Sequence, residues 1–246
     1  MRTNVFAEYF NMSVHPMIGI VCGLKSEAAV VRRACEAVSG LNVRIGVSGA
    51  RAAAARNIAV GFAQDDAKFL LSVGVSGGLD PSLTPGTLLL SRNILTPNGA
   101  AIGSLDHALF HVRPFAEAHG RWSTLLGSDE IITSPDEKAR LFAQTGAHAV
   151  DMESHGVAEA ARDAGCTFMA IRAIADAADR ALPPPALDAV APDGSTRVLS
   201  TLFKAARAPK HFPALLKLGR DSDAALGALG AVLPDLLQNI ASHMEP

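Results

Sequence analysis

The fold of this chain is indicated most clearly by residues 147–176, which read AHAVDMESHGVAEAARDAGCTFMAIRAIAD. Two apolar runs enclose an alanine-rich stretch whose apolar residues recur with helical spacing. The segment therefore predicts a strand at residues 147–152, a helix at 154–164 and a strand at 167–175. A strand, a helix and another strand within so short a segment are typical of proteins built on parallel sheets.

The same alternation continues on the N-terminal side of this segment. Strands are predicted at residues 18–22, 43–47, 69–75, 87–95 and 125–128, and helices at 26–38, 50–64 and 136–144. We therefore expect an α/β protein with a central mixed, mostly parallel sheet flanked by helices. After three prolines at 183–185 the alternation stops, and helices are predicted at 196–208 and 221–242, the second broken or kinked at Pro234.

Length and composition fit one large domain, because 246 residues of which 49% are apolar can bury a single sizeable core. We predict an N-terminal extension at residues 1–16 and an α/β core at 17–185. Residues 186–246 are expected to form a helical C-terminal part of the same domain, serving as a cap or as a membrane-docking segment.

Charge, aromatic content and cysteines exclude several classes of function. The net charge of -2 and the 5% aromatic content argue against nucleic-acid binding. The three cysteines lack CxxC spacing, which argues against a disulfide framework or a zinc site and fits the cytoplasm. Cys22 is interpreted as a small buried hydrophobe. His107 and His111 are four residues apart but have no third ligand in view, so no metal or other cofactor is predicted.

Three carboxylates stand at the ends of predicted elements. Asp176 follows an apolar strand, where burial raises the pKa of a carboxyl group and suits it to donate a proton. Glu153 follows another strand and can hold the two hydroxyls of a ribose, and Glu27 lies in a first helical turn and can activate a water. Each also has a structural explanation: a helix N-cap for Asp176, and compensation of a helix dipole for Glu153 and Glu27.

A glycine-rich stretch and one arginine are candidate contacts for a ligand. Residues 74–78, Gly-Val-Ser-Gly-Gly, are predicted to turn after a strand, so that backbone amides near Ser76 and Gly77 approach an anion or a ribose. Arg51 opens a predicted helix and is a candidate anion contact, although a solvated arginine is the commoner case.

Taken together, these segments resemble the nucleoside phosphorylase and nucleosidase superfamily, from about residue 18 to residue 179. Residues 19–27 resemble its opening strand, and the resemblance implies that Glu27 activates the attacking water. Residues 150–153 resemble its V-E-M-E segment, which implies that Glu153 and the adjacent Met152 contact the ribose. Residues 172–176 resemble its R-A-I-S-D segment, which implies that Asp176 protonates the purine at N7.

Two further likenesses concern the substrate. Methylthioadenosine/S-adenosylhomocysteine nucleosidases carry a phenylalanine against adenine, and residues 128–132, Ser-Asp-Glu-Ile-Ile, stand in that place. Ile131, with Ile132, is therefore expected to pack against the purine. Residues 150–194 resemble the hopanoid-associated branch, which is implied to remove adenine from adenosylhopane in hopanoid biosynthesis.

The resemblance thus implies hydrolysis of an adenosine-type nucleoside with a lipophilic 5′ substituent, and two alternatives remain open. One is phosphorolysis giving a ribose 1-phosphate, which Arg51 and Lys25 leave possible. Ser72 in place of an arginine of the phosphorylases, and Glu27 in place of another, favour water instead. The other alternative is a non-catalytic nucleoside-binding or storage protein on the same fold.

A lipid-bearing substrate would be met at a membrane, and residues 194–220 are suited to that contact. They contain six lysines and arginines, several apolar residues and no acidic residue. We expect a cytoplasmic enzyme with peripheral contact at the inner face of the membrane, although an ordinary helical cap explains the same pattern. A homodimer is expected by analogy with the superfamily.

Overall fold

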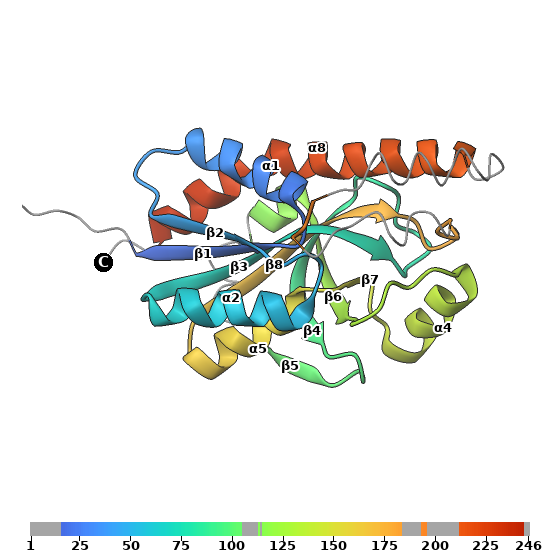
Figure 1. Ribbon diagram of the computed structural model, residues 1–246, viewed down its shortest axis with the longest axis horizontal. Coiled ribbons are helices and arrows are strands. Elements are labelled where there is room, and N and C mark those ends of the chain that lie inside the picture. The colour runs from blue at the N-terminus through green and yellow to red at the C-terminus, as the bar shows by residue number, and fades with distance from the viewer. Residues whose placement is uncertain (1–15, 105–112, 114, 184–192, 196–211, 244–246) are drawn as a thin grey trace, which may run out of the picture.

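The computed structural model describes residues 16–104, 113, 115–183, 193–195 and 212–243. It confirms the predicted α/β class (Figure 1). Most predicted elements are found within a few residues of their expected bounds. The elements with assigned bounds are β1 (Met17–Cys22), α1 (Lys25–Glu36), β2 (Val43–Val47), α2 (Ala52–Gln64), β3 (Ala67–Gly78), β4 (Leu88–Leu95), β5 (Ala101–Ser104), β6 (Arg121–Gly127), α4 (Pro135–Thr145), β7 (Ala149–Asp151), α5 (Ser154–Ala164), β8 (Thr167–Asp176) and α8 (Phe212–His243).

The strand pairings close part of the sheet on itself. The order is β2-β1-β3-β7-β6-β4-β5, and β8 pairs with both β3 and β4. Strands β3, β8, β4, β6 and β7 therefore form a closed ring, from which β1 and β2 extend on one side and β5 on the other. Five of the eight described pairings are parallel, so the prediction of a mixed, mostly parallel sheet is confirmed.

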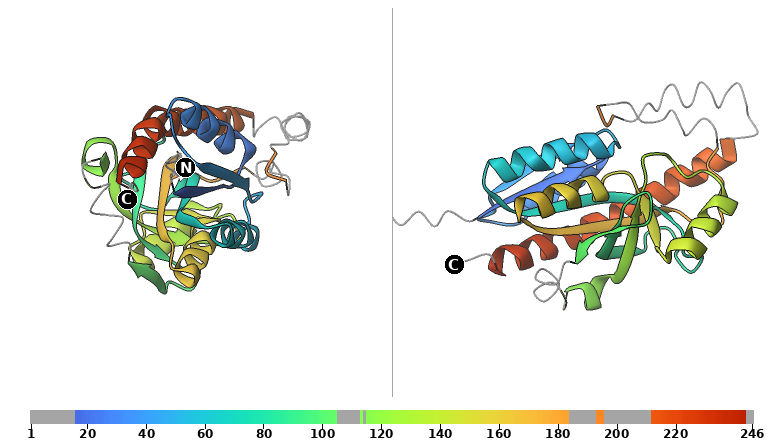
Figure 2. Two further views of the ribbon diagram at one scale, coloured as in Figure 1. Left: turned by 90° about the vertical axis from the view of Figure 1, so that its left-hand side faces the viewer. Right: turned by 90° about the horizontal axis from the view of Figure 1, so that it is seen from below.

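Helices cover both faces of the sheet. Figures 1 and 2 show α1 and α8 on one face and α2 and α5 on the other. Strand β1 shows how the sequence builds both layers, because its alternate residues face opposite ways. Ile18, Ile20 and Cys22 belong to the core beneath α1 and α8, whereas Met17 and Val21 belong to the core beneath α2 and α5. Cys22 is fully buried, as predicted.

The predicted turn at residues 74–78 is wrong, because β3 continues through it to Gly78. Gly77 and Gly78 pair with the antiparallel strand β7. A Cβ atom at Gly78 would lie only 3.3 Å from the carbonyl oxygen of Asp176. The glycines therefore allow close packing of strands here rather than a change of chain direction.

Other differences concern element ends and one short strand. Strand β6 begins at Arg121, earlier than predicted, and the four-residue β5 was not predicted. Strands β4 and β5 pair antiparallel around the turn at Gly99, whose φ of 85° favours glycine. His107, His111 and the helix predicted at 196–208 lie outside the described residues.

Helix α8 is longer than predicted and supplies much of the core. It begins at Phe212 and continues as one helix through Pro234, so Pro234 does not break it. Figure 1 shows the last part of α8 turning down across the sheet, as the predicted kink requires. Within the described chain, Pro213–Ser242 is one helix long and apolar enough to cross a membrane. Its apolar character has another explanation, because its buried residues join the core shared by α1, β1, β3 and β8. These residues are Ala225, Leu229, Val232, Leu233, Leu236, Leu237 and Ile240.

Candidate active site

The three carboxylates predicted from the sequence lie at the carboxyl ends of strands. Glu27 follows β1 across a short loop, Glu153 follows β7, and Asp176 is the last residue of β8. In Figure 1 the arrowheads of β3 and β8 point the same way, as their parallel pairing requires. All three carboxylates are buried. In α/β proteins, ligands commonly bind beyond the carboxyl ends of parallel strands, as β1, β3 and β8 are here.

A buried arginine lies at the centre of the site. The side chain of Arg172, on β8, is 1% exposed. Its Nε donates to Asp151 Oδ2 at 3.0 Å, and its Nη1 and Nη2 donate to the carbonyl and hydroxyl oxygens of Ser72 at 2.8 and 2.7 Å. Burial alone would raise the pKa of Asp151, but Arg172 and the hydrogen bonds from Ser154 hold it below its usual value. Asp151 therefore supplies the negative charge that a buried guanidinium requires.

Glu153 lies at the N-terminus of α5, where the sequence placed it to compensate the helix dipole, but its side chain makes no capping hydrogen bond. Asp151 caps the helix instead, because its Oδ1 accepts from the amides of Glu153 and Ser154 at 2.9 and 2.7 Å. Burial, and then the negative charge of Asp151, raise the pKa of Glu153 to about 8, against the pull of Arg172. At neutral pH its carboxyl group carries a proton, so it can both donate and accept a hydrogen bond.

Glu27 has both a structural contact and a place in the site. Its Oε2 accepts from the amides of Gly23 and Leu24 at 2.8 Å each, which closes the N-terminus of α1 and agrees with the structural explanation. Its Oε1 accepts from the amide of Val75 on β3 at 2.8 Å. Burial raises the pKa of Glu27 in spite of these three amides, which lower it.

Two glycines let these carboxyl groups come close to the backbone. A Cβ at Gly23 would lie 2.5 Å from Glu153 Oε1 and 3.4 Å from Glu27 Oε2. A Cβ at Gly74 would lie 2.7 Å from Glu27 Oε1. Any side chain at either position would displace a carboxyl group. The structure thus brings Glu27 and Glu153 together on either side of Gly23.

Asp176 has a separate partner, which sequence reasoning missed. Lys138, on α4, has a side chain with 0% exposure, and its Nζ donates to Asp176 Oδ2. Asp176 Oδ1 is buried and has no hydrogen-bond partner in the described chain. Burial raises the pKa of Asp176 against the effect of Lys138, which lowers it. No helix follows within residues 177–183, so the helix-cap explanation of Asp176 is wrong.

The local sequence explains how α4 presents its lysine. The Ser134 hydroxyl accepts from the amide of Glu137 at 3.2 Å, Pro135 occupies the first turn, and Gly146 ends the helix with a φ of 65°. Lys138 is three and four positions before Leu141 and Phe142, on the face that packs inward. That position is the signal by which a buried lysine could have been anticipated. For Arg172, the corresponding signal of burial is that it is the only charged residue within an otherwise apolar run.

The other ribose-side candidates lie on β3 and directly after β7. Gly77 is the register partner of Asp176, and a Cβ atom at Gly77 would lie 3.7 Å from Asp176 Oδ2. Ser76 precedes it, is buried, and has a hydroxyl oxygen without a hydrogen-bond partner in the described chain. Met152 is half-buried beside Glu153. These three residues are therefore placed next to the carboxylates.

The purine-side and anion candidates are more exposed. Ile131 is 42% exposed and Ile132 half-buried, in the segment after β6. That segment is tied to the site because the amide of Ser128 donates to the carbonyl of Asp151 at 2.8 Å. Arg51 is exposed at the start of α2. The amides of the two residues before it donate to the carbonyl of Gly23, so Arg51 lies near the loop that holds Glu27.

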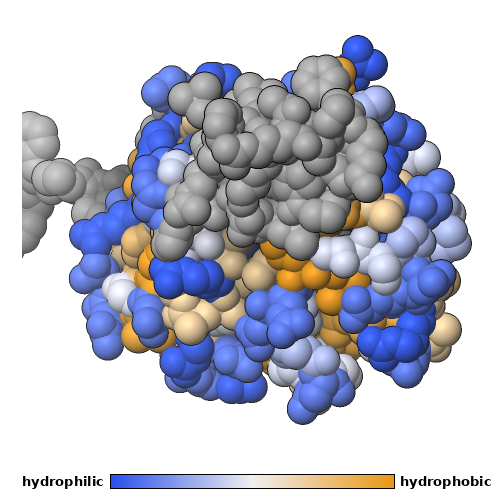
Figure 3. All heavy atoms as spheres, turned by 45° about the vertical axis from the view of Figure 1, so that its right-hand side comes forward, coloured by the Kyte–Doolittle hydropathy of each residue, from blue (hydrophilic) through white to orange (hydrophobic). Residues whose placement is uncertain are grey.

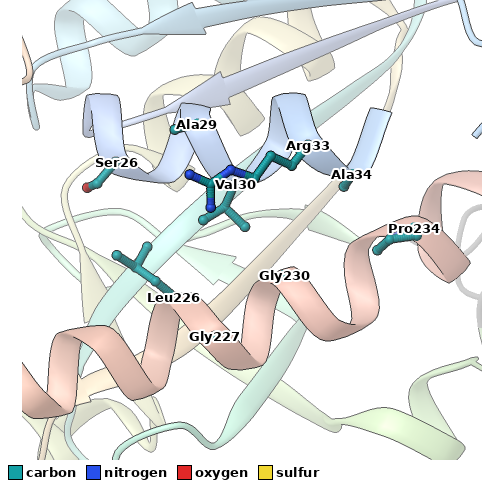
Figure 4. A pocket seen from close by; sticks show the side chains of 9 residues that line it. All are labelled: Ser26, Ala29, Val30, Arg33, Ala34, Leu226, Gly227, Gly230 and Pro234. Atoms are coloured by element: carbon teal, nitrogen blue, oxygen red, sulfur yellow. The ribbon is translucent and has the colours of Figure 1, made fainter. Parts of the chain in front are cut away.

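A groove elsewhere on the molecule includes none of the predicted site residues. It has a volume of about 470 Å³ and lies between α1 and α8 (Figure 4). It is lined by Ser26, Ala29, Val30, Arg33, Ala34, Leu226, Gly227, Gly230 and Pro234. Within the described ranges, no group of three His, Cys, Asp or Glu side chains is placed to hold a metal ion.

Comparisons with known proteins identify the family and the fold. A family model described as "Phosphorylase superfamily" matches residues 18–207. No match was found among curated proteins. Among solved structures, futalosine hydrolase of Helicobacter pylori strain 26695 is similar with a TM-score of 0.67 and 15% identity, covering 93% of this chain and 98% of that one. A methylthioadenosine/S-adenosylhomocysteine nucleosidase from Colwellia psychrerythraea 34H, in complex with adenine, has a TM-score of 0.67 and 16% identity, covering 94% and 96%. The corresponding nucleosidase from Neisseria meningitidis, in complex with methylthio-immucillin-A, has a TM-score of 0.66 and 14% identity, covering 92% and 99%.

The raised pKa of Glu153 predicts how stability depends on pH. The unfolded chain releases the proton of Glu153 near pH 4.5, whereas the folded protein releases it only at about pH 8. The stabilisation is therefore full below pH 4.5 and is lost as pH rises to about 8, by about 1.4 kcal/mol per pH unit. Glu153→Gln should remove this decline in the free energy of unfolding, measured by urea denaturation across that pH range.

The matched control is Glu117→Gln, because the Glu117 side chain is 58% exposed. This variant should keep the wild-type dependence on pH. A Glu153→Gln variant whose unfolding free energy declined as steeply as that of the wild type would show that Glu153 is already ionised in the folded protein.

Proposed function

The chain belongs to the phosphorylase superfamily, and from that premise we propose that it cleaves the N-glycosidic bond of a purine nucleoside. The observation that carries the proposal is a set of three buried carboxyl groups at the carboxyl ends of β1, β7 and β8, each in different surroundings. Glu27 contacts Gly74 on β3, and Asp176 lies beside Gly77 on the same strand. Three residue steps along β3 separate these glycines by about 10 Å.

The proposed chemistry assigns one role to each carboxyl group. As the bond between C1′ and N9 lengthens, the ribose gains oxocarbenium character and the purine gains the electron pair. Asp176, whose pKa is raised by burial, gives its proton to the purine so that it does not leave as an anion. Glu27 accepts a proton from the attacking water, and Glu153 holds the ribose hydroxyls.

Water is the proposed nucleophile, and Ser72 supports this choice. Its carbonyl and hydroxyl oxygens both accept hydrogen bonds from Arg172, so this position supplies no cation of its own for a phosphate. The carboxylate of Glu27 would also repel an anionic nucleophile. Phosphorolysis is the second candidate because Arg51 is exposed near the loop that holds Glu27.

Replacement of the acid tests the proposal directly. Asp176→Asn should lower the rate of adenine release from adenosine or methylthioadenosine by about 10²–10⁴-fold, because the amide has no proton to give. Asp179→Asn is the matched control, since Asp179 is exposed three residues away. Equal rates for the two variants, measured by chromatography of released adenine, would contradict the role of Asp176. No adenine release by the wild type would favour the non-catalytic alternative.

The nucleophile is tested by the sugar product. Wild-type protein should release adenine at the same rate with and without phosphate, and mass spectrometry should find free ribose rather than ribose 1-phosphate. Glu27→Gln should lose most of this activity, because the attacking water then lacks its base. Phosphate-dependent turnover that survives Glu27→Gln but not Arg51→Ala would support phosphorolysis instead.

The finer proposal is that the nucleoside is an adenosine with a large lipophilic 5′ substituent, namely adenosylhopane in hopanoid biosynthesis. Two observations support it. Residues 150–194 resemble the hopanoid-associated branch, as described above. Ile131 and Ile132, in the place of a purine-stacking phenylalanine, provide apolar contact without the ring of the methylthioadenosine nucleosidases.

Because such a substrate would lie in a membrane, the proposal includes peripheral contact of the enzyme with the inner face of the membrane. Residues 196–211 of the predicted docking segment lie outside the described residues, but the start of α8 is described. There Leu216 is 51% exposed, and Lys217 and Arg220 are also exposed. Figure 3 shows apolar surface in the middle of one face, with hydrophilic residues to its sides and below it. The enzyme is proposed to be cytoplasmic and, by analogy, a homodimer.

Vesicles test the lipid and the membrane together. A 5′-alkylated adenosine with a long chain should be cleaved faster when it is carried in anionic vesicles than in neutral ones. The advantage should fall at high salt, because each basic residue near an anionic surface contributes about 1 kcal/mol that ions screen. Lys217→Glu should reduce the advantage without changing the cleavage of water-soluble adenosine. Equal rates on both kinds of vesicle would remove membrane contact from the proposal.

A further inference from the structure

Lys138 is a buried cation outside the cluster around Arg172. Its ammonium group has three N–H donors, and all three are used. One donates to Asp176 Oδ2, and the others donate to the carbonyl oxygens of Ala177 and Arg180 at 2.9 and 3.1 Å. Burying an ammonium group is costly unless a carboxylate and further acceptors surround it. This lysine is therefore tied to one carboxyl group, the proposed acid.

The other charges around Asp176 have partners or are exposed. Arg180, on the segment after β8, pairs with Asp221 of α8. Asp179, on the same segment, is exposed and acts on Asp176 only through its negative charge. Among the described groups that influence Asp176, Lys138 is thus the cation that binds the carboxyl group itself.

We propose, on the premise of the function proposed above, that Lys138 is a positioning residue for the acid. Its ammonium holds Asp176 Oδ2, so that Oδ1 carries the proton that passes to the purine. The buried Oδ1 has no hydrogen-bond partner in the described chain, as this assignment requires. In the step itself the Oδ1–H bond breaks, a purine N–H bond forms, and the electron pair of the C1′–N9 bond passes to the purine.

The lysine also determines what remains after the proton has left. Asp176 is then a buried carboxylate, and beside Lys138 it forms a neutral pair instead of an unpaired charge. Lys138 therefore strengthens the acid, in the same direction as its lowering of the Asp176 pKa. Because the acid must be protonated to react, activity should fall as pH rises through that pKa. Loss of the ammonium should raise the pKa and move the alkaline fall in activity to higher pH.

Lys138→Met tests this inference, because methionine has a similar length and no charge. We expect kcat for adenine release at the pH optimum to fall about tenfold or more, since a weaker acid transfers its proton more slowly. The alkaline fall in kcat/KM should move to higher pH. Arg140→Met is the matched control, since it removes a cation from the exposed face of the same helix. It should change neither quantity.

The outcomes separate this inference from the function on which it rests. A wild-type protein that releases no adenine contradicts the proposed function. An active wild type, with a Lys138→Met variant whose alkaline fall stays at the wild-type pH, overturns the role of Lys138 and leaves the function standing. A merely structural lysine would give that second result, with activity lowered equally at every pH. If Lys138→Met does not unfold cooperatively, Lys138→Gln, which keeps a donor without the charge, takes the same test.

Discussion

The arrangement of the site depends on one buried cation, the guanidinium of Arg172. A buried charge without a partner is costly, and the pair that Arg172 forms with Asp151 links β8 to the end of β7, just before α5. The single positive charge of Arg172 acts on three carboxyl groups, those of Asp151, Glu153 and Glu27, and its effect on their pKa values differs. Asp151 is held ionised, whereas burial raises the pKa of Glu153 and of Glu27. Arg172 thus holds the pKa of one carboxyl group low, while burial raises the pKa of the two others, so three chemically similar side chains differ in acidity.

The proposed acid, Asp176, has a cation of its own, Lys138, which is separate from Arg172. Asp176 pairs with Lys138 on α4, whereas Glu27 and Glu153 gather around Gly23 near Arg172. In the proposed mechanism, the leaving group receives its proton from Asp176 beside Lys138, whereas the water loses its proton to Glu27, which accepts hydrogen bonds from three backbone amides. The backbone keeps the two sides at a fixed spacing, since both contact β3. Because Gly74 and Gly77 have no side chains, the carboxyl groups of Glu27 and Asp176 can lie close to the backbone of β3.

Local sequence predicted the elements well where periodicity was strong, as in β1, α1 and β8. It failed where a local signal and a tertiary contact disagree. The Gly77-Gly78 pair is typical of a turn, yet pairing with β7 keeps it in a strand. The position of Lys138 on the inward face of α4 indicates a buried lysine, but its pairing with Asp176 could not be read from the sequence, because the two residues are 38 positions apart. The predicted roles of Glu27, Glu153 and Asp176 stay predictions, although the structure buries all three at the carboxyl ends of strands.

The closed ring of β3, β8, β4, β6 and β7 also determines how this protein meets other chains. A strand inside a ring has its backbone donors and acceptors used on both sides, so a foreign strand has nothing there to pair with. Among the described strands, the two open edges belong to β2 and β5, at opposite ends of the sheet order. Misassociation through the backbone, when the protein is crowded or partly damaged, would start at those edges. Strand β7, which precedes Glu153, and strand β8, which carries Arg172 and Asp176, are shielded from it by the same pairing that fixes their geometry.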